Sequence, residues 1–205
     1  MHLHKEDILN LEQRYRATLI NSLAGFKTAV LVGTESKESH TNLALFNSLI
    51  HLGADPALYG LIFRPESELR DTLHNILETG CYTLNYVSVD QYQKAHQTSA
   101  RYDAKISEFD EIGFTPEYLN DFTAPFVEEA VVKIAMKFEQ KIDLAINGTS
   151  LVIGSLQHII VQNFMIEPDG FVALDQMKTL GCIGLDAYFS STRIGRLPYA
   201  KSKSE

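Results

Sequence analysis

Two long segments that favour β-strands constrain the fold of this chain more than any other feature. Residues 129–142 and 149–162 predict strands, and Asn147-Gly148 between them is a strong signal for a hairpin turn. Shorter strands are expected at residues 28–34, 57–63 and 81–87. The 57–63 segment is continuously apolar, so we expect it to be buried on both faces. Because sheet-forming segments dominate, the sequence favours a mainly β barrel with peripheral helices, an α+β chain, over a doubly wound parallel sheet.

Helices are expected at the ends of this sheet. Apolar side chains spaced by three and four residues predict a helix over residues 8–24, and Gly25 ends it. A second helix is expected from Ser67, a good N-cap, to about Thr79, with Gly80 as its stop.

The later part of the chain gives weaker helical signals. Residues 91–99 predict a short helix, and residues 103–126 predict irregular structure with short helical turns. Residues 174–188 also favour a helix, although Gly181 and Gly184 oppose it.

Composition limits the size and the partners of the chain. Its 205 residues, 45% of them hydrophobic, are enough for one well-filled core, so a single domain over 1–205 is expected. The net charge of −8 argues against nucleic acid, which needs a basic surface. No apolar stretch approaches the ~20 residues that cross a bilayer, and residues 1–10 lack the apolar core of a signal peptide. We therefore expect a cytoplasmic protein without a membrane partner, with Cys81 and Cys182 as reduced thiols.

Several familiar motifs are absent from the sequence. It contains no G-x-G-x-x-G, no G-x-x-x-x-G-K-[ST] and no G-x-S-x-G, which excludes a Rossmann fingerprint, a P-loop and a hydrolase elbow. His2 and His4 form only a weak metal signal, so no metal site is expected.

The first candidate site is the polar pair Asn47-Ser48 in the apolar segment 42–48. In a strand, the two side chains would point to opposite faces, and in a sheet interior each would need a hydrogen-bond partner. One interpretation is a strand end where both residues meet solvent or a turn. The other is a polar edge that faces a flat ligand with donor and acceptor atoms, such as an isoalloxazine ring.

The second candidate runs from Arg64 to Asn75, where a strand ends and a helix begins. Helix N-termini attract phosphate, and arginine adds a charge-assisted contact. The alternative is an ordinary surface helix, since Glu66, Glu68 and Asp71 compete for the same cations.

The third candidate, residues 94–103, contains His96, Ser99, Arg101 and Tyr102. A histidine in such a run is more often a surface or cap residue than a base, and nothing here has the spacing of a nucleophile and its base.

Taken together, these segments resemble the flavin reductase-like family of FMN-binding split barrels. The similarity covers about residues 24 to 200. It is carried by Asn42 to Leu58 (NLALFNSLIHLGADPAL), Arg64 to Ile76, Thr79 to Asn85 (TGCYTLN), His96 to Ala100, Ser107 to Pro116 and Leu151 to Gly154 (LVIG).

This resemblance implies a split β-barrel of the FMN-binding type at about 25–165. An N-terminal helix at about 6–24 precedes it, and a helical or irregular segment at about 170–205 follows. It also implies a homodimer with two FMN sites near the subunit interface. The implied cofactor-binding residues are Asn47, Ser48, Leu49 and Ile50 at the ring, Arg64, Arg70, Thr72 and Asn75 at the phosphate or ribityl chain, and Ser99 with His96 closing the phosphate side.

The implied activity is that of an oxidoreductase, in which NADH or NADPH passes a hydride to the flavin and the electrons go on to an acceptor. No catalytic side chain is implied. Thr149 stands where many members have a histidine that meets the nicotinamide, and position 47 is Asn where the family often has Ser. Two alternatives stay open: a non-catalytic FMN-binding electron carrier, and a barrel that has lost flavin and serves as an interaction module.

Overall fold

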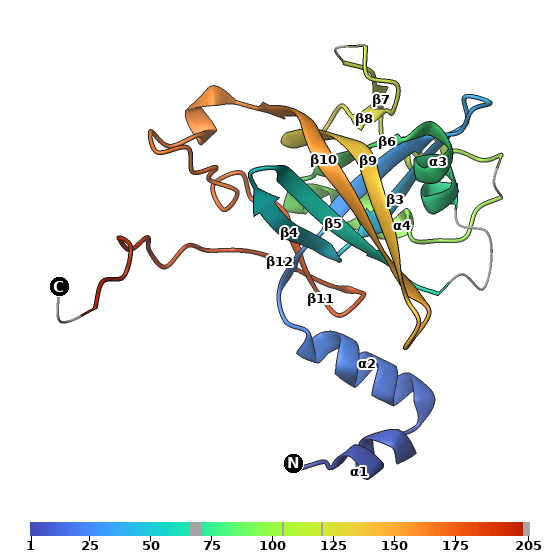
Figure 1. Cartoon of the computed structure of the whole chain (residues 1–205), viewed down its shortest axis with the longest axis vertical. Helices are drawn as coiled ribbons and strands as arrows, with labels where there is room; N and C mark the ends of the chain where they lie inside the picture. Colours follow the sequence, from blue (N-terminus) through green and yellow to red (C-terminus); the bar gives the residue numbers. More distant parts are fainter. Residues whose placement is uncertain (66–70, 104, 120, 203–205) are drawn as a thin grey trace.

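A seven-stranded antiparallel sheet with the order β3-β2-β6-β9-β10-β5-β4 forms the centre of the molecule (Figure 1). Its strands are β2 (Val30–Glu35), β3 (Thr41–Phe46), β4 (Leu49–Ala54), β5 (Ala57–Phe63), β6 (Cys81–Tyr86), β9 (Val132–Leu144) and β10 (Thr149–Val161). The structure is a computed structural model that describes residues 1–65, 71–103, 105–119 and 121–202.

A two-residue corner closes this sheet into a split barrel. Strands β3 and β4 are its two edges, yet only Asn47 and Ser48 separate them in the sequence. Since the link from Phe46 to Leu49 spans at most roughly 10 Å, the sheet has to roll until its edges meet. No ladder joins β3 to β4 among the described strands, so the barrel is split here. Strand β3 ends at Phe46, so Asn47 and Ser48 form the corner at a strand end, as one of the two interpretations held, and do not lie inside a strand.

The long hairpin β9–β10 confirms the strongest sequence signal. Gly148 has a φ of 72°, a left-handed conformation that glycine adopts without strain, and it ends a four-residue turn, 145–148, that also contains Asn147. Strand β9 begins at Val132, three residues later than expected, and ends at Leu144.

The C-terminal part of the chain is extended, and the predicted helix at 174–188 is wrong. Strands β11 (Leu180–Ile183) and β12 (Ala187–Ser190) form a hairpin that pairs with β1 (Lys27–Thr28). Gly181 lies under the ring of Phe189, where a Cβ would come within 2.3 Å of the ring, and Gly184 forms the turn with a φ of 62°. The two glycines that opposed a helix are thus the residues that this hairpin requires. Residues 191–202 contain neither helix nor strand.

Helices lie around the barrel rather than in it. The expected N-terminal helix is two helices, α1 (Lys5–Asn10) and α2 (Gln13–Leu23), and neither buries a residue completely. The remaining elements are α3 (Asp71–Thr79), α4 (Tyr92–Gln97), α5 (Glu108–Ile112), the short helices η1 (Val89–Gln91) and η2 (Asn163–Met165), and the strand pair β7 (Pro116–Glu117) and β8 (Phe126–Val127). In the described part of the chain, no helix is long and apolar enough to cross a membrane.

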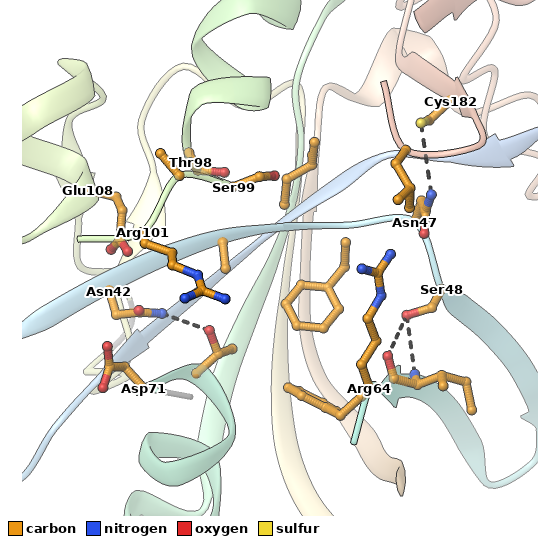
Figure 2. A pocket seen from close by; sticks show the side chains of 18 of the residues that line it. Asn42, Asn47, Ser48, Arg64, Asp71, Thr98, Ser99, Arg101, Glu108 and Cys182 are labelled. Carbon is orange, nitrogen blue, oxygen red and sulfur yellow. Dashed lines mark hydrogen bonds between the residues drawn. The ribbon is translucent and has the colours of Figure 1, made fainter. Parts of the chain in front are cut away.

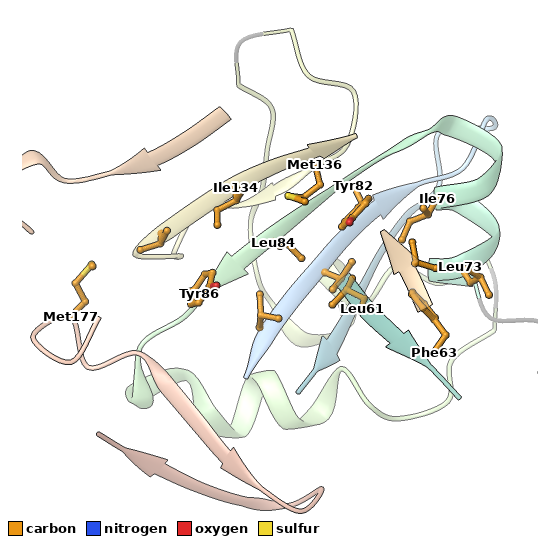
Figure 3. Close-up of a cluster of buried hydrophobic side chains, with 14 residues drawn as sticks. Leu61, Phe63, Leu73, Ile76, Tyr82, Leu84, Tyr86, Ile134, Met136 and Met177 are labelled. Atoms are coloured by element: carbon orange, nitrogen blue, oxygen red, sulfur yellow. The ribbon is translucent and has the colours of Figure 1, made fainter. Parts of the chain in front are cut away.

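Helix α3 is fixed to the barrel by its apolar face. Leu73 and Ile76 join the main core cluster, which also contains Leu61, Phe63 and Tyr82 from the strands (Figure 3). Burying such side chains contributes about 1.5–3 kcal/mol each. The packing places the first residues of α3 beside the ends of β3 and β5.

Candidate functional site

A cavity of about 720 Å³ lies beside the corner between β3 and β4 (Figure 2). Its walls come from the end of β3, the corner, the end of β5, the start of α3, residues 98–102 and the turn between β11 and β12. The sheet closes at the β3–β4 corner. Segments far apart in the sequence meet at the cavity for this reason.

The two corner residues are held by the surrounding backbone. The amide nitrogen of Asn47 donates a hydrogen bond of 2.6 Å to the carbonyl of Gly184. The hydroxyl of Ser48 donates to the carbonyl of Ile62 at 2.9 Å, and it accepts from the Ile62 N–H at 3.2 Å. Both side chains line the cavity in fixed orientations, so the corner is rigid where a ligand would meet it.

Arg64, the residue after β5, is an exposed cation on the cavity wall. Within the described residues, no ion pair or hydrogen bond of its guanidinium is found, whereas Arg193 and Arg196 are both paired with carboxylates. An unpaired guanidinium at a cavity suits an anionic or strongly polar ligand, since it carries five N–H donors in a planar fork.

The start of α3 contributes Thr72 to the cavity and Asn75 to its support. Asn42 donates from its amide to the hydroxyls of Thr34 at 3.1 Å and of Thr72 at 2.9 Å. Asn75 is buried and donates to the same Thr34 hydroxyl at 3.2 Å. It thus ties α3 to β2 and does not line the cavity, while Arg70 lies outside the described residues.

Residues 98–102 form the opposite wall. Ser99, Arg101 and Tyr102 line the cavity. His96, one turn earlier, does not; its Nδ1 lies 2.8 Å from the hydroxyl of Tyr188.

An acidic group lies at the same end of the cavity as Arg101 (Figure 2). Burial raises the pKa of the Glu108 carboxyl, and the nearby charge of Asp71 adds to this effect. The backbone N–H of Leu43 opposes it by donating to Glu108 at 3.0 Å. This end is therefore mixed in charge, while the Arg64 end is cationic.

The structure brings together half of the residues expected from the sequence. Asn47, Ser48, Arg64, Thr72 and Ser99 line one cavity, and Leu49, Ile50, Asn75 and His96 do not. Their roles toward a cofactor stay predictions.

Sequence reasoning missed several lining residues, namely Asn21, Lys27, Glu108, Cys182 and Leu185. No local pattern marks them, since they reach the cavity only through the closure of the barrel. In the part of the chain that the structure describes, no cluster of metal-ligating side chains is found.

The fold and the cavity define a split-barrel protein with a site for a ligand that carries polar groups. A model of the flavin reductase like domain matches residues 23–171. The chain therefore belongs to the flavin reductase-like domain family, as the sequence motifs predicted.

Solved structures support the same fold. A candidate flavin reductase with a split barrel domain from Shewanella frigidimarina NCIMB 400 is 49% identical, with 98% of this chain and 100% of that chain covered and a TM-score of 0.94. Nitrilotriacetate monooxygenase component B from Bacillus cereus is 18% identical over 96% of this chain and 98% of its own, with a TM-score of 0.84. The 2-nitrobenzoate 2-nitroreductase NbaA of Pseudomonas fluorescens is 22% identical over 99% and 100% of the two chains, with a TM-score of 0.81. The last two show a shared fold alone.

Proposed function

We propose that this chain binds FMN in the cavity beside the β3–β4 corner and acts as an oxidoreductase that takes a hydride from NADH or NADPH. The observation that carries the proposal is the convergence of Asn47, Ser48, Arg64, Thr72 and Ser99 on one cavity. These residues come from three separate segments of the family pattern, and no single segment required them to meet.

The residues present fit an FMN molecule in size and chemistry. The cavity of about 720 Å³ lies within the range of ordinary cofactor sites. The half-buried Phe46 offers apolar surface for a flat ring, and its ring packs edge to face on the buried Phe63 at 4.9 Å. Hydroxyls of Thr72 and Ser99, with the guanidinium of Arg64, supply donors for the ribityl chain and phosphate.

Bound FMN supplies the hydride-accepting chemistry in such a protein. The chain itself binds and orients the flavin. The corner holds the ring through side chains whose hydrogen bonds to Gly184 and Ile62 fix their positions. No side chain is assigned as a general base, so the protein contributes orientation and electrostatics.

A homodimer is part of the proposal, and the surface of the chain supports it. One chain exposes 12988 Å². A compact protein of 23.0 kDa is expected to expose about 9,600 Å². The excess of about 3,400 Å² per chain is larger than the roughly 1,000–2,500 Å² that each copy of a permanent dimer buries, so one chain leaves enough surface for such an interface.

The outer face of the barrel identifies a surface for the second copy. Along β10 the buried residues alternate with half-buried ones, and the outward half includes Leu151 and Ile153. Leu151 pairs with Ile62 on one side and with Ile142 on the other, which makes an apolar row across three strands. An outward sheet face is normally polar in a soluble protein, so this face is suited to contact a second copy.

The C-terminal segment adds to this surface. Arg193 and Arg196 pair with Glu167, Asp175 and Asp169, and both guanidinium groups stack on the Phe171 ring. The segment projects from the body (Figure 1), and its large apolar side chains are almost fully exposed: Ile194 between the two arginines, and Leu197 and Tyr199 beyond them. These are suited to pack on a partner chain.

A second candidate function, FMN binding without NAD(P)H oxidation, is favoured by Thr149. Its N–H and hydroxyl donate to the side-chain oxygen of Asn147 at 3.1 and 2.8 Å, so the hydroxyl is engaged in the hairpin turn. Thr149 also does not line the cavity. An electron carrier would need no residue for the nicotinamide.

Mixing the FMN-loaded protein with NADH or NADPH under argon separates these functions. We expect the flavin absorbance to bleach with at least one donor, faster than for free FMN at the same concentration. Thr149→Ala serves as a matched control and is expected to leave the rate unchanged, since the hydroxyl lies in the turn. If neither donor bleaches the flavin while dithionite does, the carrier function replaces the oxidoreductase.

A further inference from the structure

We infer that Asn47 selects isoalloxazine rings with an unsubstituted N3, because its side-chain carbonyl is placed to accept a hydrogen bond from the N3–H group of the ring. The inference rests on the proposed binding of FMN and assigns one polar contact within that site.

The amide nitrogen of Asn47 is already engaged. It donates to the carbonyl oxygen of Gly184 at 2.6 Å, and the thiol of Cys182 lies 3.9 Å from it on the same side. A backbone carbonyl accepts hydrogen bonds and cannot donate them. The position of Gly184 therefore fixes which end of the Asn47 amide is nitrogen.

The amide oxygen of Asn47 is left for a ligand. Figure 2 shows the nitrogen directed toward Cys182 and the oxygen directed away from it, and Asn47 lines the cavity. Within the described residues, no donor bonded to this oxygen is found, although the nitrogen is bonded. The Asn47 side chain thus offers the ligand an acceptor and no donor.

The neighbouring corner residue is less suited to this role, since the Ser48 oxygen already takes part in two hydrogen bonds and keeps one lone pair, whereas no hydrogen bond to the Asn47 amide oxygen is found among the described residues. The hydroxyl of Ser48 donates its only proton to the Ile62 carbonyl and accepts from the Ile62 N–H. Asn47 is therefore the better acceptor of the two corner side chains.

The chemistry of the isoalloxazine ring identifies the donor that can pair with the Asn47 carbonyl. The oxidised isoalloxazine ring has a single N–H group, at N3, and its other polar edge atoms are acceptors. An acceptor held rigidly at the wall discriminates strongly, because a ligand without the matching donor leaves a desolvated carbonyl unpaired. The ribityl hydroxyls are the competing donors, and methylation of N3 distinguishes the two since it leaves the ribityl chain intact.

The experiment compares FMN with N3-methyl-FMN by fluorescence titration of the full-length protein. We expect the wild type to bind N3-methyl-FMN about 10- to 100-fold more weakly than FMN. In Asn47→Ala the ratio of the two dissociation constants should fall below about threefold, since no acceptor remains. Asn10→Ala, which removes an exposed asparagine of α1 that does not line the cavity, should keep the wild-type ratio.

Asn47→Ser provides a second variant in case the alanine variant does not fold, as judged by circular dichroism. A serine hydroxyl is shorter and rotates, so the ratio should again fall well below that of the wild type. Equal binding of the two flavins by the wild type would overturn the inference, and so would an undiminished ratio in the folded variants. Failure to bind FMN itself would refute the proposed function, an outcome that the first titration reveals by itself.

Discussion

Replacing Arg64 with alanine is expected to weaken FMN binding by about 10- to 100-fold, because hydrogen bonds between charged groups contribute about 1.5–3 kcal/mol. The guanidinium lies on the cavity wall, and no carboxylate among the described residues is paired with it. Its removal therefore takes away a contact to the ligand and breaks no ion pair or hydrogen bond among the described residues. Fluorescence titration with FMN measures the change.

Three comparisons make this result specific. Arg64→Lys should recover part of the affinity, since it keeps the charge and loses the planar fork. Arg14→Ala, on an exposed part of α2, should leave the affinity unchanged. The third comparison repeats the titration with riboflavin, which lacks the phosphate. If Arg64→Ala weakens the binding of FMN and leaves that of riboflavin unchanged, Arg64 contacts the phosphate. If it weakens the binding of both equally, Arg64 contacts the rest of the flavin. Unchanged affinity in Arg64→Ala would contradict the assignment of Arg64 to the site.

Placing a charge on the outer face of the barrel is expected to dissociate the proposed dimer. Ile142 is 38% exposed in one chain and pairs directly with Leu151 in the apolar row. In Ile142→Glu, the two-fold symmetry of a dimer would bury two unpaired carboxylates, which raises the dissociation constant by about 100-fold or more. Sedimentation velocity over a concentration series measures this constant.

Ile159→Glu is the matched control for the dimer. It introduces the same residue toward the opposite end of β10, at a position that is 59% exposed in one chain. This variant should sediment as the wild type does. A wild type that is monomeric throughout the series would refute the dimer, and a folded, dimeric Ile142→Glu would place the interface elsewhere.

Much of the fold follows from local sequence signals. The hairpin β9–β10 was predictable because its turn depends on Asn147 and Gly148, two adjacent residues. The end of α3 at Gly80 was predictable for the same reason, since a φ of 76° suits glycine. Such features depend on neighbouring residues alone.

The C-terminal hairpin was not predictable in this way. Residues 174–188 have apolar spacing compatible with a helix, and their strands form only because Lys27 and Thr28 pair with β11. That contact joins residues more than 150 positions apart. Local helical spacing therefore predicted the wrong structure, because pairing with a strand distant in the sequence determines the conformation of this segment.

The same distinction applies to the site. Asn47, Ser48, Arg64, Thr72 and Ser99 were predictable because they lie in motifs with a family spacing. The role of Asn75 as a link between α3 and Thr34 depends on a contact across 41 residues. The engagement of Asn47 with Gly184, across 137 residues, was equally hidden from sequence patterns.

Titration of the flavin-free protein with FMN tests the central claim most directly. We predict saturable quenching of FMN fluorescence that ends at one FMN per chain, together with a rise in the melting temperature of the protein. Neither quenching nor a thermal shift at FMN concentrations up to the millimolar range would contradict the claim that this cavity is a flavin site.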